Sequence, residues 1–440
     1  MRWYKKAADQ RLEEALYTLG VMFEEGRGVA QSDTEAAKWY MKAADLGDML
    51  SECRIGGMFK SGRGVAQCDV EAAWWYKKAA DHGCAQAQYK LAILIEDDCG
   101  LVPSKSELAP GCKASAGEGD PQVPSASAQN FAACCLWKDS NVEAARWFKA
   151  AANQGLVEAQ YKLGILYADG CGVEQSDSEA ARWFKIAADQ GEKNAQYNVG
   201  LMIANGRGFE QDVYAMACWY KAAADQGHIL AQYRLASLFE IDHGVVESEV
   251  EAARYFKRAA EQGHAISQWK MGVLSEDGRG VAQSYVEAVQ WYSKAADQGH
   301  LGAQCNLGIM FEKGRGVVQS AKEVAQCYRK AADQGSLAAQ YNLGNLLLTG
   351  RGGVAQSDVE AAKWYKKAAD QGMVEAQRAL GCLYMDDGGV FLSNAEAIHW
   401  FKKAAEQGDA KAQSELNVLL AQGREVSPSN MDAGKEGAGD

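Results

Sequence analysis

Bulky residues recur along this chain at a constant interval, and each is followed by small and polar residues in the same order. The anchors of the pattern are Trp39, Trp75, Trp147, Trp183, Trp219, Tyr255, Trp291, Cys327, Trp364 and Trp400, with Trp3 as an incomplete first copy. Successive anchors lie 36 residues apart, except for a double step after Trp75 and a step of 37 before Trp364. A period between about 20 and 50 residues indicates one supersecondary unit stacked many times.

The anchor lies in the middle of the first predicted helix, here called the Trp helix, which one copy places between Ser176 and Gly191. Its start is predicted by a capping box, in which the Ser hydroxyl accepts from the third residue's N–H and the Glu carboxylate reaches back. The Gly eight residues after the anchor predicts a left-handed residue at the helix end. The box recurs as Ser32/Glu35, Ser176/Glu179, Ser284/Glu287, Ser320/Glu323, Ser357/Glu360 and Ser393/Glu396, and the Gly as Gly47, Gly155, Gly191, Gly227, Gly299 and Gly372.

A second helix with the pattern A-Q-Y-x-L-G, here called the Gln helix, is expected between Gly155 and Gly170. Ala159, Leu163 and Tyr167 recur at intervals of four and share one apolar face. A G-R-G-V connector then returns the chain to the next Ser cap. Two helices of about 13 residues, each roughly 20 Å long, fill the period.

The sizes of the side chains predict how the units stack. Large Trp, Tyr and Phe side chains alternate with alanines that let neighbouring backbones approach, and 48% of the chain is apolar although mean hydropathy is −0.33. A single unit cannot cover its own apolar face, so each unit buries that face against the next copy. We therefore predict an all-α solenoid of helix-turn-helix repeats.

The consensus E-A-A-x-W-Y-K-K-A-A-D-Q-G, the A-Q-Y-x-L-G helix and the G-x-G-V loop resemble the Sel-1-like repeat family, a relative of the tetratricopeptide repeats, over nearly the whole chain. The period of 36 exceeds the tetratricopeptide period of 34 by two loop residues. The resemblance implies a right-handed α-α superhelix with a concave, helix-lined surface. It also implies a non-catalytic scaffold or adaptor that binds other proteins, in signalling or in quality-control complexes such as those of endoplasmic-reticulum-associated degradation.

The charge balance narrows the classes of partner. The net charge is −12 and the isoelectric point is near 5.2, without basic runs, which argues against nucleic acid as a partner. No apolar stretch approaches the 18 residues of a membrane helix, so we expect no direct insertion into a membrane. Met1 begins inside a first helix without its cap, which is consistent with truncation upstream and with a lost signal peptide. Our prediction for the location is cytoplasmic.

Twelve cysteines are scattered over different positions of the repeat. In one branch of the Sel-1-like family, every repeat contains a cysteine pair whose disulfide links the two helices of that repeat. Here Cys53 and Cys305 replace the Tyr of the Gln helix, Cys327 replaces the anchor and Cys68 replaces the cap Ser. No repeat contains a complementary pair at a recurring spacing, which argues against disulfide clamps and favours a reducing compartment.

The segment between Cys99 and Asn141 interrupts the repeat. Four of the five prolines and a Ser/Gly-rich tract lie there. We assign 1–100 and 141–423 as repeat arrays, 101–140 as a degenerate repeat or linker, and 424–440 as a disordered tail. A metal site built on the segment's cysteines is the weakest interpretation, because it lacks C-x-x-C spacing and a nearby His. A partly disordered linker and a stretch translated out of frame both remain open.

Candidate catalytic chemistry is sparse. His228, His264 and His300 all follow the repeat Gly, which indicates capping or a surface position, and no triad partner is recognisable. The G-R-G-V loops lack the Lys-Ser/Thr of a phosphate-binding P-loop and indicate turns instead. We predict no enzyme activity, no cofactor and no metal. The alternative is a β-lactamase-like hydrolase, as in cysteine-rich relatives, and the missing cysteine pairs argue against it.

The residues on either side of the aromatic pair are often basic and lie three apart on one face of the Trp helix. In one interpretation they form a solvated face, paired with an Asp four residues further on. In the other they form a basic surface, on the helix expected to line the concavity, for an acidic or extended segment of a partner protein. We call this set the basic row, and its members are Lys38, Arg146, Lys149, Arg182, Lys185, Lys221, Arg254, Lys257, Arg329, Lys363 and Lys366.

If residues 101–138 are an out-of-frame stretch, another reading frame of the gene there will restore the repeat. We expect W-F-K-K-A-A-D-Q-G near position 111 and A-Q-Y-x-L-G shortly after it, because the interval from Trp75 to Trp147 equals two periods. Resequencing of the coding region decides the matter. If no frame contains the repeat consensus, the frameshift hypothesis is wrong and the linker interpretation remains.

Overall fold

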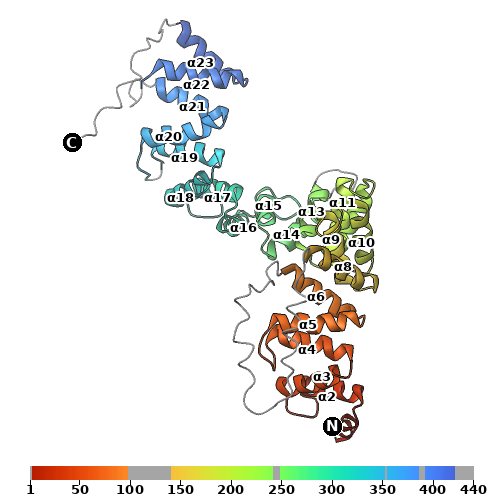
Figure 1. The fold of residues 1–440 in the computed structure, drawn as a ribbon. Coiled ribbons are helices and arrows are strands. Elements are labelled where there is room, and N and C mark those ends of the chain that lie inside the picture. The colour runs from red at the N-terminus through yellow and green to blue at the C-terminus, as the bar shows by residue number, and fades with distance from the viewer. Residues whose placement is uncertain (1, 98–139, 241–247, 352–353, 386–391, 422–440) are drawn as a thin grey trace, which may run out of the picture. The chain divides into compact units, whose positions relative to one another are not determined.

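The computed structural model describes residues 2–97, 140–240, 248–351, 354–385 and 392–421, and every regular element among them is an α-helix (Figure 1). The predicted all-α solenoid of helix-turn-helix repeats is confirmed. The described helices form two compact units, Met1–Ala231 and Gln232–Asp440. The assignments of 101–140 and 424–440 lie almost wholly outside the described residues and stay predictions.

The first unit begins with α1 (Arg2–Asp9) and alternates Gln helices and Trp helices thereafter. Its helices are α2 (Glu13–Glu25), α3 (Asp33–Ala44), α4 (Met49–Ser61), α5 (Asp69–Asp81), α6 (Ala85–Asp97), α8 (Ser140–Asn153), α9 (Val157–Asp169), α10 (Asp177–Asp189), α11 (Lys193–Asn205) and α12 (Val213–Asp225). The division between the units falls within α13 (Ile229–Glu240).

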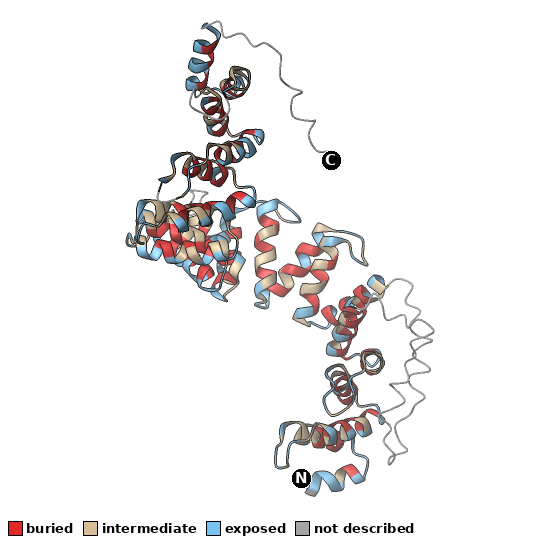
Figure 2. Ribbon diagram, turned by 90° about the vertical axis from the view of Figure 1, so that its left-hand side faces the viewer, coloured by how far each residue is buried: buried red, intermediate tan, exposed pale blue. Residues whose placement is uncertain are grey.

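The second unit continues the same alternation, each helix packing against the next along the chain. Its helices are α14 (Glu249–Glu261), α15 (Ala265–Asp277), α16 (Tyr285–Asp297), α17 (Leu301–Lys313), α18 (Ala321–Asp333), α19 (Leu337–Thr349), α20 (Asp358–Asp370), α21 (Val374–Met385), α22 (Asn394–Glu406) and α23 (Ala410–Ala421). In both units the buried residues lie where helices face their neighbours (Figure 2).

The starts of the Trp helices confirm half of the predicted capping box. Ser176 Oγ accepts from the Glu179 N–H at 3.3 Å, and the other five predicted Ser caps do the same. The second half of the prediction is wrong, because the Ser176 N–H donates to the Tyr167 carbonyl of the preceding Gln helix at 2.9 Å. That donor is therefore satisfied by the neighbouring helix, which leaves the Glu carboxylate free to bind a basic residue.

The two glycines of the G-x-G connector have different steric roles. Gly62 ends α4 in the left-handed conformation with φ 68°. Gly64 also has a positive φ of 70°, and a Cβ there would lie 2.2 Å from the Asp33 carbonyl oxygen at the start of α3. The second glycine thus lets the connector lie directly against the first turn of the Trp helix.

The repeats are held together by an aromatic ring that lies on a glycine. The Tyr292 ring of α16 lies so close to Gly272 of α15 that a Cβ on this glycine would be 2.4 Å from it. Tyr292 is fully buried, and Gly272 is the final residue of the A-Q-Y-x-L-G pattern. The same contact recurs as Gly20/Tyr40, Gly56/Tyr76, Gly164/Phe184, Gly200/Tyr220, Gly308/Tyr328, Gly344/Tyr365 and Gly381/Phe401.

A ladder of buried glutamines connects successive repeats. Gln160 of α9 is 3% exposed, and its Nε2 donates to the Ala152 carbonyl of α8 at 3.2 Å. Its Oε1 accepts from Nε2 of Gln190, at the end of α10, at 2.6 Å. A buried amide is thereby satisfied as donor and acceptor. The inter-repeat bond recurs as Gln226/Gln196, Gln262/Gln232, Gln298/Gln268, Gln334/Gln304, Gln371/Gln340 and Gln407/Gln377.

Stacking continues across residues 98–139, because α6 packs against α8 as consecutive helices do elsewhere. Gln154 Nε2 donates to Gln88 Oε1 at 2.8 Å, and Lys162 pairs with Glu96 at 2.9 Å. The two partners are 66 residues apart in each of these pairs, whereas equivalent partners elsewhere are 30 apart. The difference is one period, so α6 and α8 are bonded as consecutive helices are elsewhere, although one more period of sequence lies between them.

We predict opposite effects of the same substitution at two adjacent glycines of α4. A Cβ at Gly56 would lie 2.8 Å from the Tyr76 ring, so Gly56→Ala should lower the unfolding free energy by about 1–3 kcal/mol through overpacking. A Cβ at Gly57 meets only the Tyr76 hydroxyl at 3.4 Å. Gly57→Ala should therefore stabilise by up to about 1 kcal/mol, the gain in helix propensity.

Chemical denaturation followed by circular dichroism measures both glycine variants, with the wild-type chain as reference. Equal destabilisation by the two substitutions would show that the ring-on-glycine contact does not set the spacing of the repeats.

Candidate interaction surface

The basic row follows the predicted face of the Trp helices. All of its members are exposed except Lys185, which is half-buried. The aromatic anchors between these basic residues point inward, and Trp147 and Trp183 are only 7% and 5% exposed. The helix therefore buries its aromatic pair and leaves the basic side chains at the surface.

Most members of the row are neutralised by acids on their own helix. The residue before the anchor pairs with the Glu of the capping box, as Arg182 does with Glu179 at 3.5 Å. The residue after it pairs with the Asp four positions on, as Lys221 does with Asp225 at 2.7 Å. The same arrangements hold Lys38, Arg146, Lys185, Arg254 and Lys363. These pairs agree with the interpretation as a solvated face, and each exposed pair adds little stability.

Four members of the row keep an uncompensated charge. Among the described residues, no ion pair joins Lys149, Lys257, Arg329 or Lys366 to an acid. Each lies two residues after the anchor of its Trp helix. The part of the row that is open to a partner is therefore much smaller than the sequence indicated.

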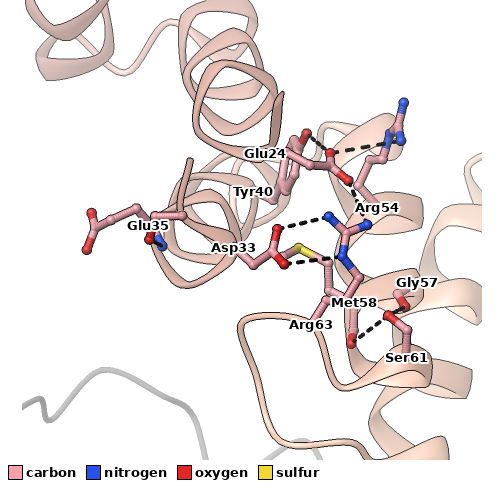
Figure 3. Close-up of polar contacts among 10 residues, drawn as sticks. Glu24, Asp33, Glu35, Tyr40, Arg54, Gly57, Met58, Ser61 and Arg63 are labelled. Atoms are coloured by element: carbon pink, nitrogen blue, oxygen red, sulfur yellow. Dashed lines mark hydrogen bonds and ion pairs between the residues drawn. The ribbon is translucent and has the colours of Figure 1, made fainter. Parts of the chain in front are cut away.

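The Arg of the G-R-G connector, which follows one Gln helix, binds acids on the Trp helix and the Gln helix that precede it (Figure 3). Arg63 binds Asp33, the first residue of α3, with its Nη2 2.9 Å from Oδ1. It also reaches Glu24 of α2 at 3.4 Å, and the Tyr40 hydroxyl donates to the same carboxylate at 2.7 Å. Arg207 and Arg279 bind Asp177 and Glu249 in the same way. Sequence reasoning took these loops as turns and missed the ion pairs, because the partners lie 30 residues apart.

The three predicted surface histidines lie at the starts of Gln helices, where the rings of His228 and His300 cap the helix and the His264 ring bonds the Ser267 hydroxyl at 2.8 Å. Nδ1 of His228 accepts from the Ala231 N–H at 3.1 Å, and Nδ1 of His300 accepts from the Ala303 N–H at the same distance. The His228 ring is stacked on Tyr197 of the preceding Gln helix, with centroids 4.5 Å apart. Burial lowers the pKa of His228, His264 and His300 below the usual value. The expectation of a capping position is confirmed.

Tyr197 and His228 occupy two positions that also face each other between other successive Gln helices. We call them the junction pair: the residue after the buried Gln of one Gln helix and the residue that caps the next Gln helix. Other junction pairs are Tyr233/His264, Trp269/His300, Cys305/Ser336 and Arg378/Asp409, with the last at 2.7 Å. Cys53 and Cys84 occupy the same two positions and share a hydrogen bond.

The two facing cysteines were missed from the sequence because each repeat was taken to begin at the Trp helix, and Cys53 and Cys84 fall on either side of such a boundary. Their sequence separation of 31 residues, the same as that of Cys305 and Ser336, was the available signal. All eight cysteines within the described ranges carry free thiols.

Within the described ranges, none of the helices has the length and apolar character needed to cross a membrane. The same ranges contain no group of three or more His, Cys, Asp and Glu side chains placed to hold a metal ion.

The repeat geometry agrees with a family model. The Sel1 repeat model matches residues 1–12, 13–48, 50–84, 126–156, 157–192, 193–228, 229–264, 265–300, 302–336, 337–373 and 374–409. The chain belongs to the Sel1 repeat family. Such helical solenoids are generally non-enzymatic scaffolds that mediate protein interactions.

Solved structures of Sel1 repeat proteins resemble the chain over most of its length. One is c5321, a protective antigen of uropathogenic Escherichia coli with an SLR fold, which is 30% identical, with a TM-score of 0.77 over 96% of this chain and 83% of that one. Another is a Sel1 repeat protein from Oxalobacter formigenes, also 30% identical, with a TM-score of 0.55 over 78% of this chain and 89% of that one. No curated protein matches the chain.

The family match shifts the phase of the repeat by half a period. A matched unit such as 157–192 consists of a Gln helix and the Trp helix that follows it, here α9 and α10. The Trp helix is therefore the second helix of the Sel1 unit, whereas the sequence analysis placed it first. We expected the Trp helix to line a concave surface because we took it as the first helix of the unit. Its place as the second helix removes that argument.

The capping histidines predict a pH dependence of stability. Because the folded pKa values of His228, His264 and His300 lie below the unfolded value near 6.5, the unfolded chain binds more protons in the window beneath that value. The contribution of the neutral histidines is present above about pH 6.5 and is lost as the pH falls through their folded pKa values. Wild-type stability should therefore fall more between pH 7 and 5 than that of a chain with all three replaced by Ser, the cap at position 336.

Urea unfolding of both chains across this pH range measures the effect. Parallel pH profiles for the wild-type and the His→Ser chain would show that these histidines do not become protonated on unfolding.

Proposed function

We propose that this Sel1 repeat protein is a scaffold that binds acidic, extended segments of partner proteins along its Trp helices. The observation that carries the proposal is the uncompensated charge at Lys149, Lys257, Arg329 and Lys366, which recurs at one position of the unit in a chain whose net charge is −12. Acidic segments can meet this charge at the same position of each of these Trp helices, and the contacts give specificity and a faster association rate.

The neutralised members of the row contribute to this proposal in a different way. Arg146, Arg182 and Arg254 are exposed and held by a Glu three residues earlier, so each keeps unused guanidinium donors for a second carboxylate. A partner's acid would then share the arginine with the capping-box Glu. Signalling and protein quality-control complexes remain the expected settings on the basis of the family. No observation on the described residues favours the β-lactamase-like alternative.

A charge-reversal variant tests the row directly. Lys149→Glu, Lys257→Glu and Lys366→Glu together should weaken binding of a fluorescent Asp/Glu-rich peptide to the full chain by about tenfold or more, as measured by anisotropy. The matched control carries Lys193→Glu, Lys313→Glu and Lys411→Glu, which reverse three exposed lysines on Gln helices. The control should keep most of the affinity.

Three outcomes of the binding experiment would overturn the proposal. They are equal losses in the two variants, tight binding of a neutral Gly/Ser peptide of the same length, and no binding of the acidic peptide by the wild-type chain. Circular dichroism of each variant confirms that the helices are intact before binding is compared.

A further inference from the structure

The junction between α4 and α6 differs in chemistry from the other described junctions. Cys53 takes the position of the Gln-helix Tyr on α4, and Cys84 takes the cap position before α6. Both are buried, with 8% and 7% of their surface exposed, and both belong to the same apolar core cluster. They lie on either side of α5, so a bond between them would join α4 directly to the start of α6.

The geometry of the other junction pairs places these two side chains in contact. At the same two positions, the Cys305 Sγ lies 3.5 Å from the Ser336 Oγ. Short and long side chains alike meet there, from this pair to the salt bridge of Arg378 and Asp409. The Cys53 and Cys84 thiols likewise share a hydrogen bond, so the contact follows from the repeat and not from a local accident of packing.

The two sulfurs have different environments. Cys84 precedes the first turn of α6, where the backbone N–H groups of Gln86 and Ala87 point at its sulfur. The hydrogen bond from Cys53 and these N–H groups lower the pKa of Cys84 to about 6, although burial opposes them. The same hydrogen bond and burial raise the pKa of Cys53. Cys84 is thus suited to be the attacking thiolate and Cys53 to be the resolving thiol.

A buried ion-pair cluster beside the cysteines fixes the loop that carries Cys84. Glu52 replaces the ladder Gln and is fully buried, and its carboxylate lies 2.9 Å from His82 Nδ1 and 3.0 Å from Lys78 Nζ. His82 replaces the partner Gln of the ladder, so both members of this rung have changed together. Because Glu52 adjoins Cys53 and His82 lies two residues before Cys84, this rung holds the two cysteines opposite each other.

We propose that Cys53 and Cys84 form a reversible dithiol–disulfide site that cross-links α4 to the start of α6, with small-molecule disulfides of the glutathione type as its oxidising substrates. The thiolate of Cys84 attacks one sulfur of the small disulfide, which forms a mixed disulfide and releases one small thiolate. The proton of Cys53 passes to that thiolate. The Cys53 sulfur then attacks the Cys84 sulfur, forms the protein disulfide and releases the second small molecule as a thiolate, which takes up from water the proton that Cys84 lost when it ionised.

The electrons balance over the two steps. Two protein thiols are oxidised to one disulfide, and one small disulfide is reduced to two thiols. An excess of the small thiol reverses the reaction. The cross-link would prevent α4 and the start of α6 from separating, and it would stabilise this end of the array against unfolding.

Peptide mapping of the full chain tests the proposal. The reduced protein is incubated with oxidised glutathione, quenched with acid, alkylated and digested with trypsin. Cys53 and Cys84 fall in separate peptides, residues 43–54 and 79–90, and each peptide contains no other cysteine. We expect these two peptides to be linked to each other, and the link to disappear when the protein is returned to reduced glutathione. Thermal unfolding should begin at a higher temperature in the oxidised chain.

Single substitutions separate the two roles. Cys53→Ser should leave Cys84 as a mixed disulfide with glutathione, whereas Cys84→Ser should leave Cys53 unmodified. The matched control is Ser336→Cys, which places a second thiol opposite Cys305 at an equivalent junction pair. A linked peptide through position 336 is expected, because the Cys305 Sγ already lies 3.5 Å from the Ser336 Oγ. Alkylation of wild-type Cys84 should also become half-maximal near pH 6.

Several results would overturn the proposal. They include a Cys53–Cys84 link no more abundant than other pairings, a link that forms only after denaturation, and modification of Cys53 before Cys84. Failure of both thiols to react in the folded wild-type chain would have the same meaning, and that measurement does not depend on whether any variant folds.

Discussion

At eight of the ten described steps from a Gln helix to the next Trp helix, the array depends on the approach of an aromatic ring to a glycine backbone; Ala92 and Ala236 stand at the glycine position in the other two. Because Gly272 and its equivalents have no Cβ, the ring of the next Trp helix lies directly on the helix backbone, closer than any other residue would allow. This contact sets the spacing between a Gln helix and the Trp helix that follows it. At that spacing Gln160 and Gln190 can bond, the Ser176 N–H reaches Tyr167, and the G-R-G loop lies against its own Trp helix.

Around this fixed contact, the polar positions of the junctions vary in pairs. The ladder rung is Gln with Gln in most places and Glu52 with His82 in one. The junction pair is aromatic with His, Cys with Ser, Arg with Asp, or Cys with Cys. A buried polar group left without its partner is costly, so both members change together. The chain thus keeps one frame and gives individual junctions their own chemistry.

On the outer surface, too, some positions are fixed by packing and others differ from repeat to repeat. The aromatic pair of each Trp helix is required by the packing, while the side chains beside it are exposed and free to vary. Most basic members of the row are held by a Glu or Asp on their own helix, and within the described residues Lys149, Lys257, Arg329 and Lys366 are not. A scaffold built in this way can present the same backbone geometry on every repeat and select its partner by the few charges that remain uncompensated.

The sequence by itself determined the period, the two helices, their Ser caps and their glycine ends, because these depend on residues close together in the chain. It also gave the positions of the basic row, since their spacing on a helix is local. Only the tertiary structure decided which residues meet across repeats: the glutamine ladder, the partner of Arg63, the acceptor of the Ser N–H and the facing of Cys53 and Cys84. Except for the acceptor of the Ser N–H, these partners are separated by 30 or more residues. In a periodic chain, several other residues lie at equal spacing and could be the partner. Their choice follows from the packing of one helix against the next, which no local pattern contains.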